Sequence, residues 1–291
     1  MLAENQVPLP ALAPFGAVLE GLQVADDDPA TLGRVIGALH RHRVVALRDQ
    51  RLTPEQFVRF ARRLGRPQPH IKTELRHPDC PEILLLSNLF REGKAIGIYD
   101  GAAYWHTDMS YEAEPASATL VHALQVPERG GETLFCDMAA AYEALPAARR
   151  AELDGLQVIH HYGNRSDPEE GSRTSATPLT EEQKRAVREV RHPLVLAHPA
   201  TGRKALYGVA GSSFGIVGLE AAAACALLDE LKRHATQERF RHAHRYAPGD
   251  LVIWDNLATL HAASLIEPAT GPADSRLLHR ISVKGMPSIA A

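Results

Sequence analysis

The sequence predicts a mainly β protein with flanking helices, and two observations support that prediction. Short apolar runs with strand character cluster around turns through most of the chain, while helical patterns occur early and again in one late segment. Strands and helices therefore do not alternate regularly, which argues against a doubly wound parallel sheet. An antiparallel sandwich or barrel with helices packed outside fits this order, and the interior of such a barrel is a natural pocket.

Two helices are expected near the N-terminus, each with a clear start signal. Asp28 precedes Pro29, a favoured pairing of N-cap and first helical residue, and apolar residues then recur at helical spacing. Thr53 precedes Pro54 in the same way, and Gly65 ends the second helix. Later helices are expected over residues 137–146, 146–155 and 219–235.

The expected strands are short apolar segments bounded by turn signals. They cover residues 43–49, 82–88, 118–127, 132–137, 156–162, 192–199, 204–209, 239–246, 250–255 and 276–285. Residues 128–131 form a turn signal between two of these strands. Residues 163–191 are polar and contain Gly, Ser and Pro, so we expect a long loop there, a lid or insert within one domain spanning 1–291.

Composition argues against several classes of function. The net charge is −3 and no basic run occurs, so nucleic acid is not expected as a partner. The three cysteines are far apart and form no C-x-x-C motif, which fits a reducing cytoplasm. No apolar run approaches 18 residues, so no membrane span is expected. The sequence thus predicts a cytoplasmic globular protein.

The segment AAYWHTDMSYEAEP holds a His and an Asp two positions apart, His106 and Asp108. Such a pair is a weak signal alone and needs a third ligand. His261 follows the apolar segment DLVIWD, and a His just beyond a strand end can point into a barrel mouth. Two imidazoles and one carboxylate suit a non-haem Fe(II) centre with three open positions on one face. The alternative for His261 alone is a residue that caps or packs near a strand end.

Five sequence elements occur in a fixed order. They are Trp105-His106-Thr107-Asp108, Gly130-Gly131-Glu132-Thr133, Trp254-Asp255-Asn256, His261, and Arg276 with Arg280. In this order, from about residue 40 to residue 285, the chain resembles the family of taurine dioxygenase and 2,4-dichlorophenoxyacetate dioxygenase. These are Fe(II)- and 2-oxoglutarate-dependent oxygenases, and the resemblance implies a double-stranded β-helix, or jelly-roll, fold. Two longer segments are more similar to the aryloxyacetate branch than to the taurine branch.

The resemblance implies that His106, Asp108 and His261 bind Fe(II), that 2-oxoglutarate takes two open positions, and that O₂ takes the third. The far carboxylate of 2-oxoglutarate then needs a fixed cation, and Arg offers a bidentate, permanently charged fork that Lys does not. By resemblance this cation is Arg276, helped by the Thr133 hydroxyl. Oxidative decarboxylation gives succinate and CO₂, and the protein positions a substrate C–H bond and excludes water.

Arg280 lies four residues after Arg276, so on a strand both would face the same way with their Cα atoms roughly 13 Å apart. One anion cannot comfortably use both, and the resemblance implies that Arg280 binds the anionic group of the substrate. A surface Arg280 in a salt bridge is the alternative. His70 matches a substrate-contacting His of the taurine branch, and Asn88 and Tyr99 are further pocket candidates. An Asn at a strand end often only satisfies a turn.

Two other histidine patterns are not expected to bind metal. His77-Pro78-Asp79 lies in a polar connection without a following G-G-E-T segment. His242 and His244 share a strand face, but no third ligand accompanies them in the pattern. Residues 255–256 are expected to stabilise the turn before His261. The segment 163–191 and the Pro- and Gly-containing 266–273 depart from the family pattern, so the substrate is the least determined feature.

We therefore expect a dioxygenase that hydroxylates an aliphatic carbon of a small organic anion, either a carboxylate, possibly aryloxyalkanoate-like, or a sulfonate. Its cofactors would be Fe(II), 2-oxoglutarate and O₂, and a homo-oligomer is expected. One alternative is a biosynthetic oxygenase of the same mechanism that hydroxylates or desaturates an amino-acid derivative. Another is a Zn²⁺-dependent hydrolase with the same ligands, which would leave Arg276 and Thr133 without a purpose. A third is a non-catalytic, ligand-sensing jelly roll.

Overall fold

The computed structural model describes residues 14–98, 103–162, 188–285 and 287. Its larger sheet runs in the order β1 (Ala17–Leu19), β2 (Val44–Leu47), β15 (Leu251–Asp255), β7 (Ala118–Gln125), β17 (Leu277–Lys284) and β3 (Arg66–Gln68). A further strand, β4 (Leu84–Ser87), also pairs with β17. A smaller sheet runs in the order β14 (Arg241–His244), β8 (Thr133–Asp137) and β16 (Thr259–Ala263). The β1–β2 pair is parallel, and the other pairs in these two sheets are antiparallel.

The remaining strands form small sheets at the periphery. One runs in the order β10 (Val190–Pro193), β9 (Gln157–His160) and β13 (Ser213–Ile216), and β11 (Val195–Ala197) pairs with β12 (Lys204–Leu206). A hairpin joins β5 (Phe90–Arg91) and β6 (Lys94–Ala95). The α-helices are α1 (Pro29–His42), α2 (Pro54–Leu64), α3 (Met138–Glu143), α4 (Ala147–Leu153) and α6 (Ala221–Ala235). Short 3-10 helices are η1 (Val24–Asp26), η2 (Thr73–Leu75), η3 (Glu238–Phe240) and η4 (Pro272–Asp274). None of the helices in the described ranges has the length and apolar character needed to cross a lipid bilayer.

The two main sheets face each other across an apolar layer. In β15, Leu251 and Ile253 belong to the core shared with α1 and α2, whereas Val252 and Trp254 point to the opposite side. There Trp254 meets Phe135 of β8 in an edge-to-face contact, with ring centroids 5.4 Å apart. Since alternate residues of one strand enter two apolar layers, the strand shows an unbroken apolar run instead of a polar–apolar alternation.

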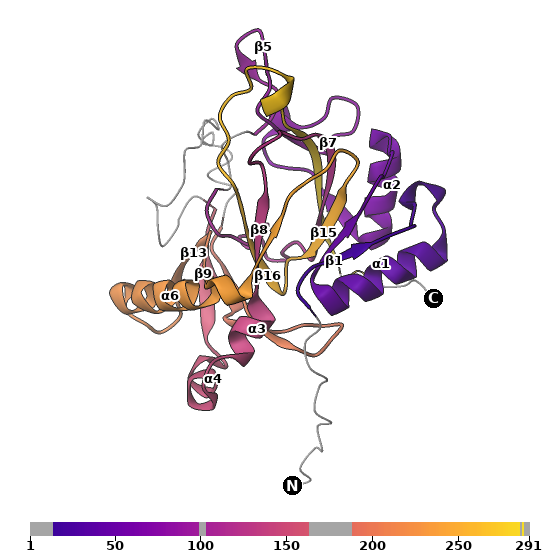
Figure 1. The fold of residues 1–291 in the computed structure, drawn as a ribbon. Helices are drawn as coiled ribbons and strands as arrows, with labels where there is room; N and C mark the ends of the chain where they lie inside the picture. The colour runs from indigo at the N-terminus through magenta and orange to yellow at the C-terminus, as the bar shows by residue number, and fades with distance from the viewer. Residues whose placement is uncertain (1–13, 99–102, 163–187, 286, 288–291) are drawn as a thin grey trace.

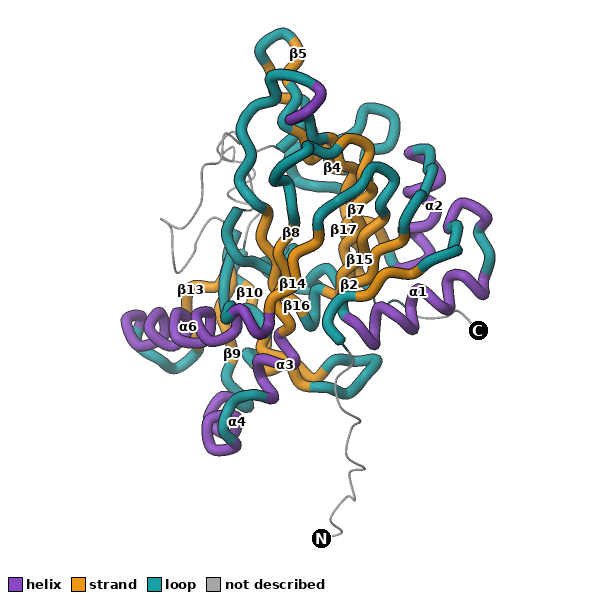
Figure 2. Tube along the Cα trace, in the orientation of Figure 1, coloured by secondary structure: helices purple, strands orange, loops and turns teal. Residues whose placement is uncertain are grey.

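Helices cover the outer sides of both sheets. The helices α1 and α2 lie against the larger sheet. On the opposite side of the molecule α6 lies beside β9 and β13, and α3 lies between, next to β16 (Figures 1 and 2). The mainly β arrangement with flanking helices predicted from the sequence is therefore confirmed.

The two predicted N-terminal helices begin where their capping residues predict. The Asp28 carboxylate accepts hydrogen bonds from the backbone N–H groups of Ala30 and Thr31. Thr53 forms a capping box with Gln56. At the end of α2, a Cβ atom on Gly65 would lie 2.5 Å from the carbonyl oxygen of Lys284 in β17. Gly65 therefore lets α2 end directly against the larger sheet.

Several details differ from the sequence prediction. The strand expected over 192–199 is split between β10 and β11, which lie in different sheets. The split follows Pro193, which has no N–H to donate to a continued ladder. The predicted loop 163–191 overlaps β10 at its last two residues, and positions 163–187 lie outside the described residues. The strands β1, β3, β5, β6, β13 and β16 (Thr259–Ala263) were not predicted.

Candidate active site

Three side chains from separate parts of the chain converge between the two main sheets. His261 lies inside β16, opposite Phe135 of β8, and not beyond a strand end as the sequence predicted. The backbones of His106 and His261 form an isolated antiparallel bridge, in which each N–H donates to the other carbonyl at 2.9 Å. The Oδ1 atom of Asp108 lies 3.5 Å from the Nε2 atoms of both histidines.

This donor set fits one metal ion. The ligand atoms of His106, Asp108 and His261 all lie within 4.8 Å of one another. A separation of 3.5 Å is long for a strong hydrogen bond. It suits atoms that share one ion, because ligands about 2.1 Å from a metal lie roughly 3 Å from each other. Within the described ranges, no other trio of His, Cys, Asp or Glu is arranged this way.

The protonation states also suit metal binding. Burial lowers the pKa of His261 to about 4, so its imidazole is neutral at neutral pH and can offer a lone pair. Burial raises the pKa of Asp108, but the charge of Arg280 and the two imidazoles outweigh that effect and hold the pKa well below its usual range. The Nδ1 atom of His106 lies 2.9 Å from the carbonyl oxygen of Tyr104. With the ring proton on Nδ1 and donated to this carbonyl, Nε2 is left as the metal-facing acceptor.

Hydrogen bonds behind Asp108 bring in residues that the sequence analysis missed. The hydroxyl of Thr119 in β7 donates to Asp108 Oδ2 at 2.7 Å. The Asn256 amide donates to Thr119 at 2.9 Å and accepts from the Trp254 indole N–H at 3.1 Å. Asn256 therefore does more than stabilise the turn before β16, because it also reaches the support of a metal ligand.

A second polar group gathers Arg276, Thr133 and Tyr246. Arg276 is 5% exposed, and burial lowers its pKa to about 10, so it stays protonated at neutral pH. The hydroxyls of Thr133 and Tyr246 are 2.9 Å apart, and Tyr246 acts electrostatically on Arg276. Gly131 has a φ of +77°, and a Cβ there would come within 2.9 Å of Pro127. The G-G-E-T segment thus forms a turn beside Arg276 that favours glycine.

Arg280 points toward the metal ligands. Its Nη2 atom lies 2.5 Å from Asp108 Oδ1 and 3.0 Å from the Ser282 hydroxyl. The alternative of a surface salt bridge does not fit, because Asp108 is only 3% exposed. Burial, followed by the charge of Arg280, lowers the pKa of His70 to about 4, so His70 is neutral and close to Arg280.

Three tyrosines lie near Arg280 or the metal ligands. Burial raises the pKa of Tyr111, and the charge of Arg280 acts in the opposite direction. The rings of Tyr111 and Tyr162 are 4.7 Å apart in an edge-to-face contact. The ring of Tyr104 packs against that of His106, with centroids 5.1 Å apart. Tyrosine rings therefore flank the space near both Arg280 and His106.

The structure places Asn88, one of the predicted pocket residues, among hydrogen bonds to other parts of the chain. The side-chain N–H groups of Asn88 donate to the carbonyls of Glu267 and Asp274, and its Oδ1 accepts from the backbone N–H of Arg276. This leaves Asn88 no free N–H for a substrate, so its position favours a structural role in holding the segment before β17. Tyr99 lies outside the described residues.

The histidines that the sequence analysis set aside have other neighbours. The His244 ring nitrogen Nε2 lies 3.1 Å from Asp250 Oδ2. His77 packs edge-to-face against His279, with centroids 5.3 Å apart. His242 packs edge-to-face against Phe15, with centroids 6.0 Å apart. These contacts agree with the interpretation that none of the three is a metal ligand.

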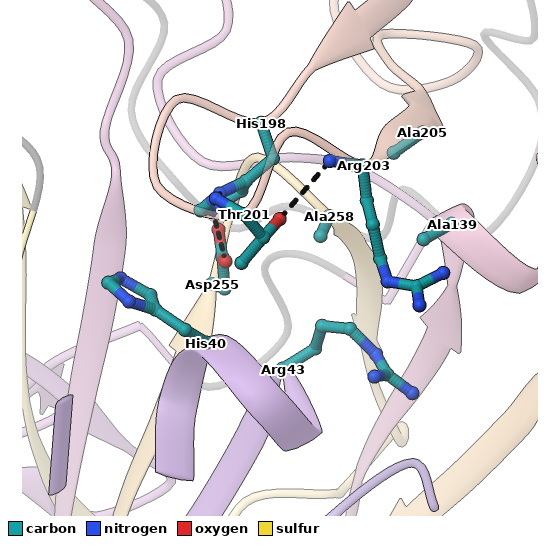
Figure 3. Close-up of a pocket in the computed structure, with 9 residues that line it drawn as sticks. All are labelled: His40, Arg43, Ala139, His198, Thr201, Arg203, Ala205, Asp255 and Ala258. Carbon is teal, nitrogen blue, oxygen red and sulfur yellow. Dashed lines mark hydrogen bonds and ion pairs between the residues drawn. The ribbon is translucent and has the colours of Figure 1, made fainter. Parts of the chain in front are cut away.

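A small cavity of about 10 Å³ lies at the end of β15 (Figure 3). It is lined by His40, Arg43, Ala139, His198, Thr201, Arg203, Ala205, Asp255 and Ala258. His198 Nε2 lies 2.7 Å from Asp255 Oδ2, and Asp255 Oδ1 accepts from the backbone N–H of Leu257 at 2.9 Å. A cavity of this size holds about one water molecule. The cavity therefore lies among the side chains that stabilise the turn leading into β16. It is too small for an organic substrate.

Comparison with known proteins places this geometry in a family. Residues 7–282 match the family described as taurine catabolism dioxygenase TauD, TfdA family. The chain belongs to this family. It is 37% identical over 273 residues to pentalenolactone F synthase of Streptomyces arenae, which covers 90% of each chain. It is 35% identical over 261 residues to the alpha-ketoglutarate-dependent 2,4-dichlorophenoxyacetate dioxygenase of Cupriavidus pinatubonensis, which covers 85% of this chain and 88% of that relative.

A solved taurine dioxygenase from Burkholderia xenovorans has the same fold. Its TM-score to this structure is 0.74 at 31% sequence identity, with 95% of this chain and 88% of that chain covered. The resemblance predicted from the sequence motifs is thus confirmed. The protein is a 2-oxoglutarate-dependent dioxygenase, an oxidoreductase that uses Fe(II), 2-oxoglutarate and O₂.

Proposed function

We propose that this dioxygenase hydroxylates an aliphatic C–H bond of a small organic anion. The favoured substrate is a carboxylate with an aromatic or extended apolar portion, oxidised at a carbon near the anion. The observation that supports it most strongly is Arg280, a largely buried cation whose guanidinium reaches the metal-binding carboxylate. We further propose that the two facing sheets form the double-stranded β-helix of the family.

His106, Asp108 and His261 would hold Fe(II) through two neutral imidazoles and one carboxylate oxygen. Bound Fe(II), together with 2-oxoglutarate and O₂, supplies the oxidant that removes hydrogen from the substrate carbon, and 2-oxoglutarate leaves as succinate and CO₂. The backbone bridge between His106 and His261 fixes the spacing of the two imidazoles. The side chains around them position the substrate and keep water out.

Arg276 and Thr133 would bind the far carboxylate of 2-oxoglutarate. Arg276 is buried and protonated, and its fork matches a carboxylate bidentately. The hydroxyls of Thr133 and Tyr246 carry one proton each, and their mutual hydrogen bond uses only one of the two. The second hydroxyl proton is therefore available for an anion beside Arg276.

Arg280 would bind the anionic group of the primary substrate. A metal bound to Asp108 Oδ1 would weaken the ion pair between that oxygen and Arg280, because two cations would then share one acceptor. A largely buried guanidinium needs another counter-charge, which a carboxylate or sulfonate supplies and a neutral ester does not. In this arrangement neutral His70 would add a hydrogen bond to the anion, and Tyr111 and Tyr162 would offer aromatic walls for an apolar portion.

The test measures succinate formed from 2-oxoglutarate with Fe(II) and O₂ across a panel of candidate substrates. The panel contains 2,4-dichlorophenoxyacetate, (S)-phenoxypropionate, taurine, and the methyl esters of the two acids. We expect an aryloxyalkanoate to stimulate succinate release and its ester not to do so. Stimulation by acid and ester alike would exclude an anion-binding role for Arg280.

The identity to pentalenolactone F synthase supports a second candidate, a biosynthetic oxygenase of the same mechanism. The amino-acid derivative expected from the sequence stays one possible substrate of that candidate, and a lactone-bearing carboxylate is another. Strong succinate release with such a compound and none with aryloxyalkanoates would favour the second candidate. The homo-oligomer and the cytoplasmic location stay predictions.

A further inference from the structure

A closed ring of side chains lies behind the metal ligand Asp108. The Thr119 hydroxyl contacts Asp108 Oδ2 at 2.7 Å and the Ser282 hydroxyl at 3.0 Å. Arg280 closes the ring through Ser282 at 3.0 Å and Asp108 Oδ1 at 2.5 Å. The Asn256 amide joins from outside the ring at Thr119. Thr119 is fully buried, so its own contacts do not compete with bulk water.

The donors and acceptors of this ring allow one arrangement of protons. A metal-binding Asp108 is a carboxylate and only accepts, so Thr119 must donate its single proton to Oδ2. The Trp254 indole only donates, which fixes the Asn256 oxygen toward Trp254 and the Asn256 N–H toward Thr119.

The remaining hydroxyl follows by elimination. Thr119 has already given its proton away, so Ser282 must donate to Thr119. Ser282 in turn accepts from Arg280, which only donates. The hydrogen bonds therefore run in one direction, from Arg280 through Ser282 and Thr119 to the Asp108 carboxylate. Aligned hydrogen bonds of this kind polarise one another.

We propose that Thr119 is a positioning residue that makes Asp108 a one-oxygen metal ligand, and that Ser282 connects it to Arg280. This inference rests on the proposed metal-binding role of Asp108. Thr119 occupies Oδ2, so only Oδ1 is left to face His106 and His261. Asn256 and Ser282 keep the Thr119 hydroxyl pointed at the carboxylate. This orientation is the role that we assign to Asn256 of the W-D-N motif.

The arrangement also links two sites. Arg280, the proposed contact for the substrate anion, is the first donor of the chain that ends on the metal ligand. A substrate anion that draws Arg280 away from Ser282 therefore breaks the first hydrogen bond of the series that ends on Asp108. Ser282 carries one part of this effect, and the direct contact of Arg280 with Asp108 Oδ1 carries the other.

The test compares Thr119→Val with Thr119→Ser in Mn(II) binding, measured by isothermal titration calorimetry, and in the visible absorption of bound Co(II). Valine keeps the shape and the strand preference of threonine but removes the hydroxyl, whereas serine keeps the hydroxyl. Ser117→Ala is the matched control, because the buried Ser117 hydroxyl donates only to the backbone carbonyls of Val283 and Gly285. Thermal unfolding of each metal-free variant reports general destabilisation.

We expect Thr119→Val to bind Mn(II) about 10-fold to 100-fold more weakly than the wild type, the usual effect of losing a partner of a metal ligand. Its Co(II) spectrum should change, and Thr119→Ser should restore both properties. Ser117→Ala should unfold at a lower temperature yet bind Mn(II) like the wild type. Unchanged Mn(II) binding in Thr119→Val, or equal weakening in Ser117→Ala, would overturn the positioning role alone. A wild-type protein that binds no Mn(II) would overturn the proposed metal function itself.

Discussion

Replacing Gly211 with alanine should displace the metal ligand His106, although residue 211 is not itself a ligand. Gly211 has a φ of +76°, and a Cβ built there lies 2.7 Å from the Cβ of His106 and 3.1 Å from its Cα. Carbon atoms in contact are normally about 3.5–4.0 Å apart. The backbone segments around Gly211 and His106 must therefore separate by roughly 1 Å. A shift of that size is a large fraction of a metal–ligand bond of about 2.1 Å.

The energetic cost of Gly211→Ala has two parts that can be separated. A left-handed conformation costs an L-residue roughly 1–2 kcal/mol, and overpacking of a tight contact adds about 1–3 kcal/mol. Gly218→Ala is the control for the first part, because Gly218 has a φ of +84° and nothing within 4 Å of its added Cβ. Both variants should lose stability, and only Gly211→Ala should also lose metal affinity.

The assay combines thermal unfolding of the metal-free variants with Mn(II) titration calorimetry. Gly218→Ala should bind Mn(II) as the wild type does, and Gly211→Ala should bind at least 10-fold more weakly, as expected when the support of a ligand is disturbed. Wild-type Mn(II) affinity in Gly211→Ala would refute the reasoning, since His106 would then tolerate the displacement or would not be a ligand.

Three further outcomes follow from other parts of the site. Arg276→Ala should raise the 2-oxoglutarate concentration needed for half-maximal succinate release by about 30-fold or more, because a buried carboxylate loses its charged partner. If Arg276→Ala leaves that concentration unchanged and Arg280→Ala raises it, then Arg280 binds 2-oxoglutarate and Arg276 binds the substrate anion. Arg280→Ala should lose the preference for an acid over its methyl ester, measured as the ratio of turnover rates. Burial, with smaller effects from two neighbouring histidines, lowers the pKa of His279 to about 4. His279 therefore stays neutral in the folded protein while it takes up a proton in the unfolded chain, so stability falls as the pH drops from about 6.5 to about 4, by at most about 1.4 kcal/mol per pH unit. His279→Gln should flatten that part of the unfolding profile, and an unchanged slope would contradict the buried neutral state.

The parts of the structure that the sequence predicted are those with local signals. Asp28 and Thr53 cap their helices because an N-cap needs only residues two or three positions away. The apolar run of β15 predicted a strand, and the structure shows that this strand is buried on both sides. The three metal-ligand candidates also came from short motifs, and the structure brings their ligand atoms together.

The support of the metal ligands could not be predicted in this way. Thr119, Asn256 and Ser282 come from β7, the turn after β15, and β17, which are neighbours only in the folded sheets. A Thr or Ser inside a strand is ordinary, so nothing in its sequence context distinguishes one that contacts a carboxylate. Tyr246 was missed for the same reason, because its contact with Thr133 joins two neighbouring strands of the smaller sheet at their ends.

Strand boundaries were the other source of error. His261 was expected beyond a strand, but β16 begins only four residues after the end of β15 and pairs with β8 instead. The strand β13 was missed because its segment contains Gly215, where its pairing register with β9 shifts. Short strands of this kind are defined by their partners more than by their own composition.

The central claim is that His106, Asp108 and His261 hold the Fe(II) of a 2-oxoglutarate-dependent dioxygenase. The most direct measurement is succinate formation from 2-oxoglutarate by the wild type and by His261→Ala, with iron content determined on the same samples. We predict one Fe(II) per chain and succinate formation in the wild type, and neither in a His261→Ala protein that retains its fold by circular dichroism. Stoichiometric iron and full succinate formation in His261→Ala would contradict the account.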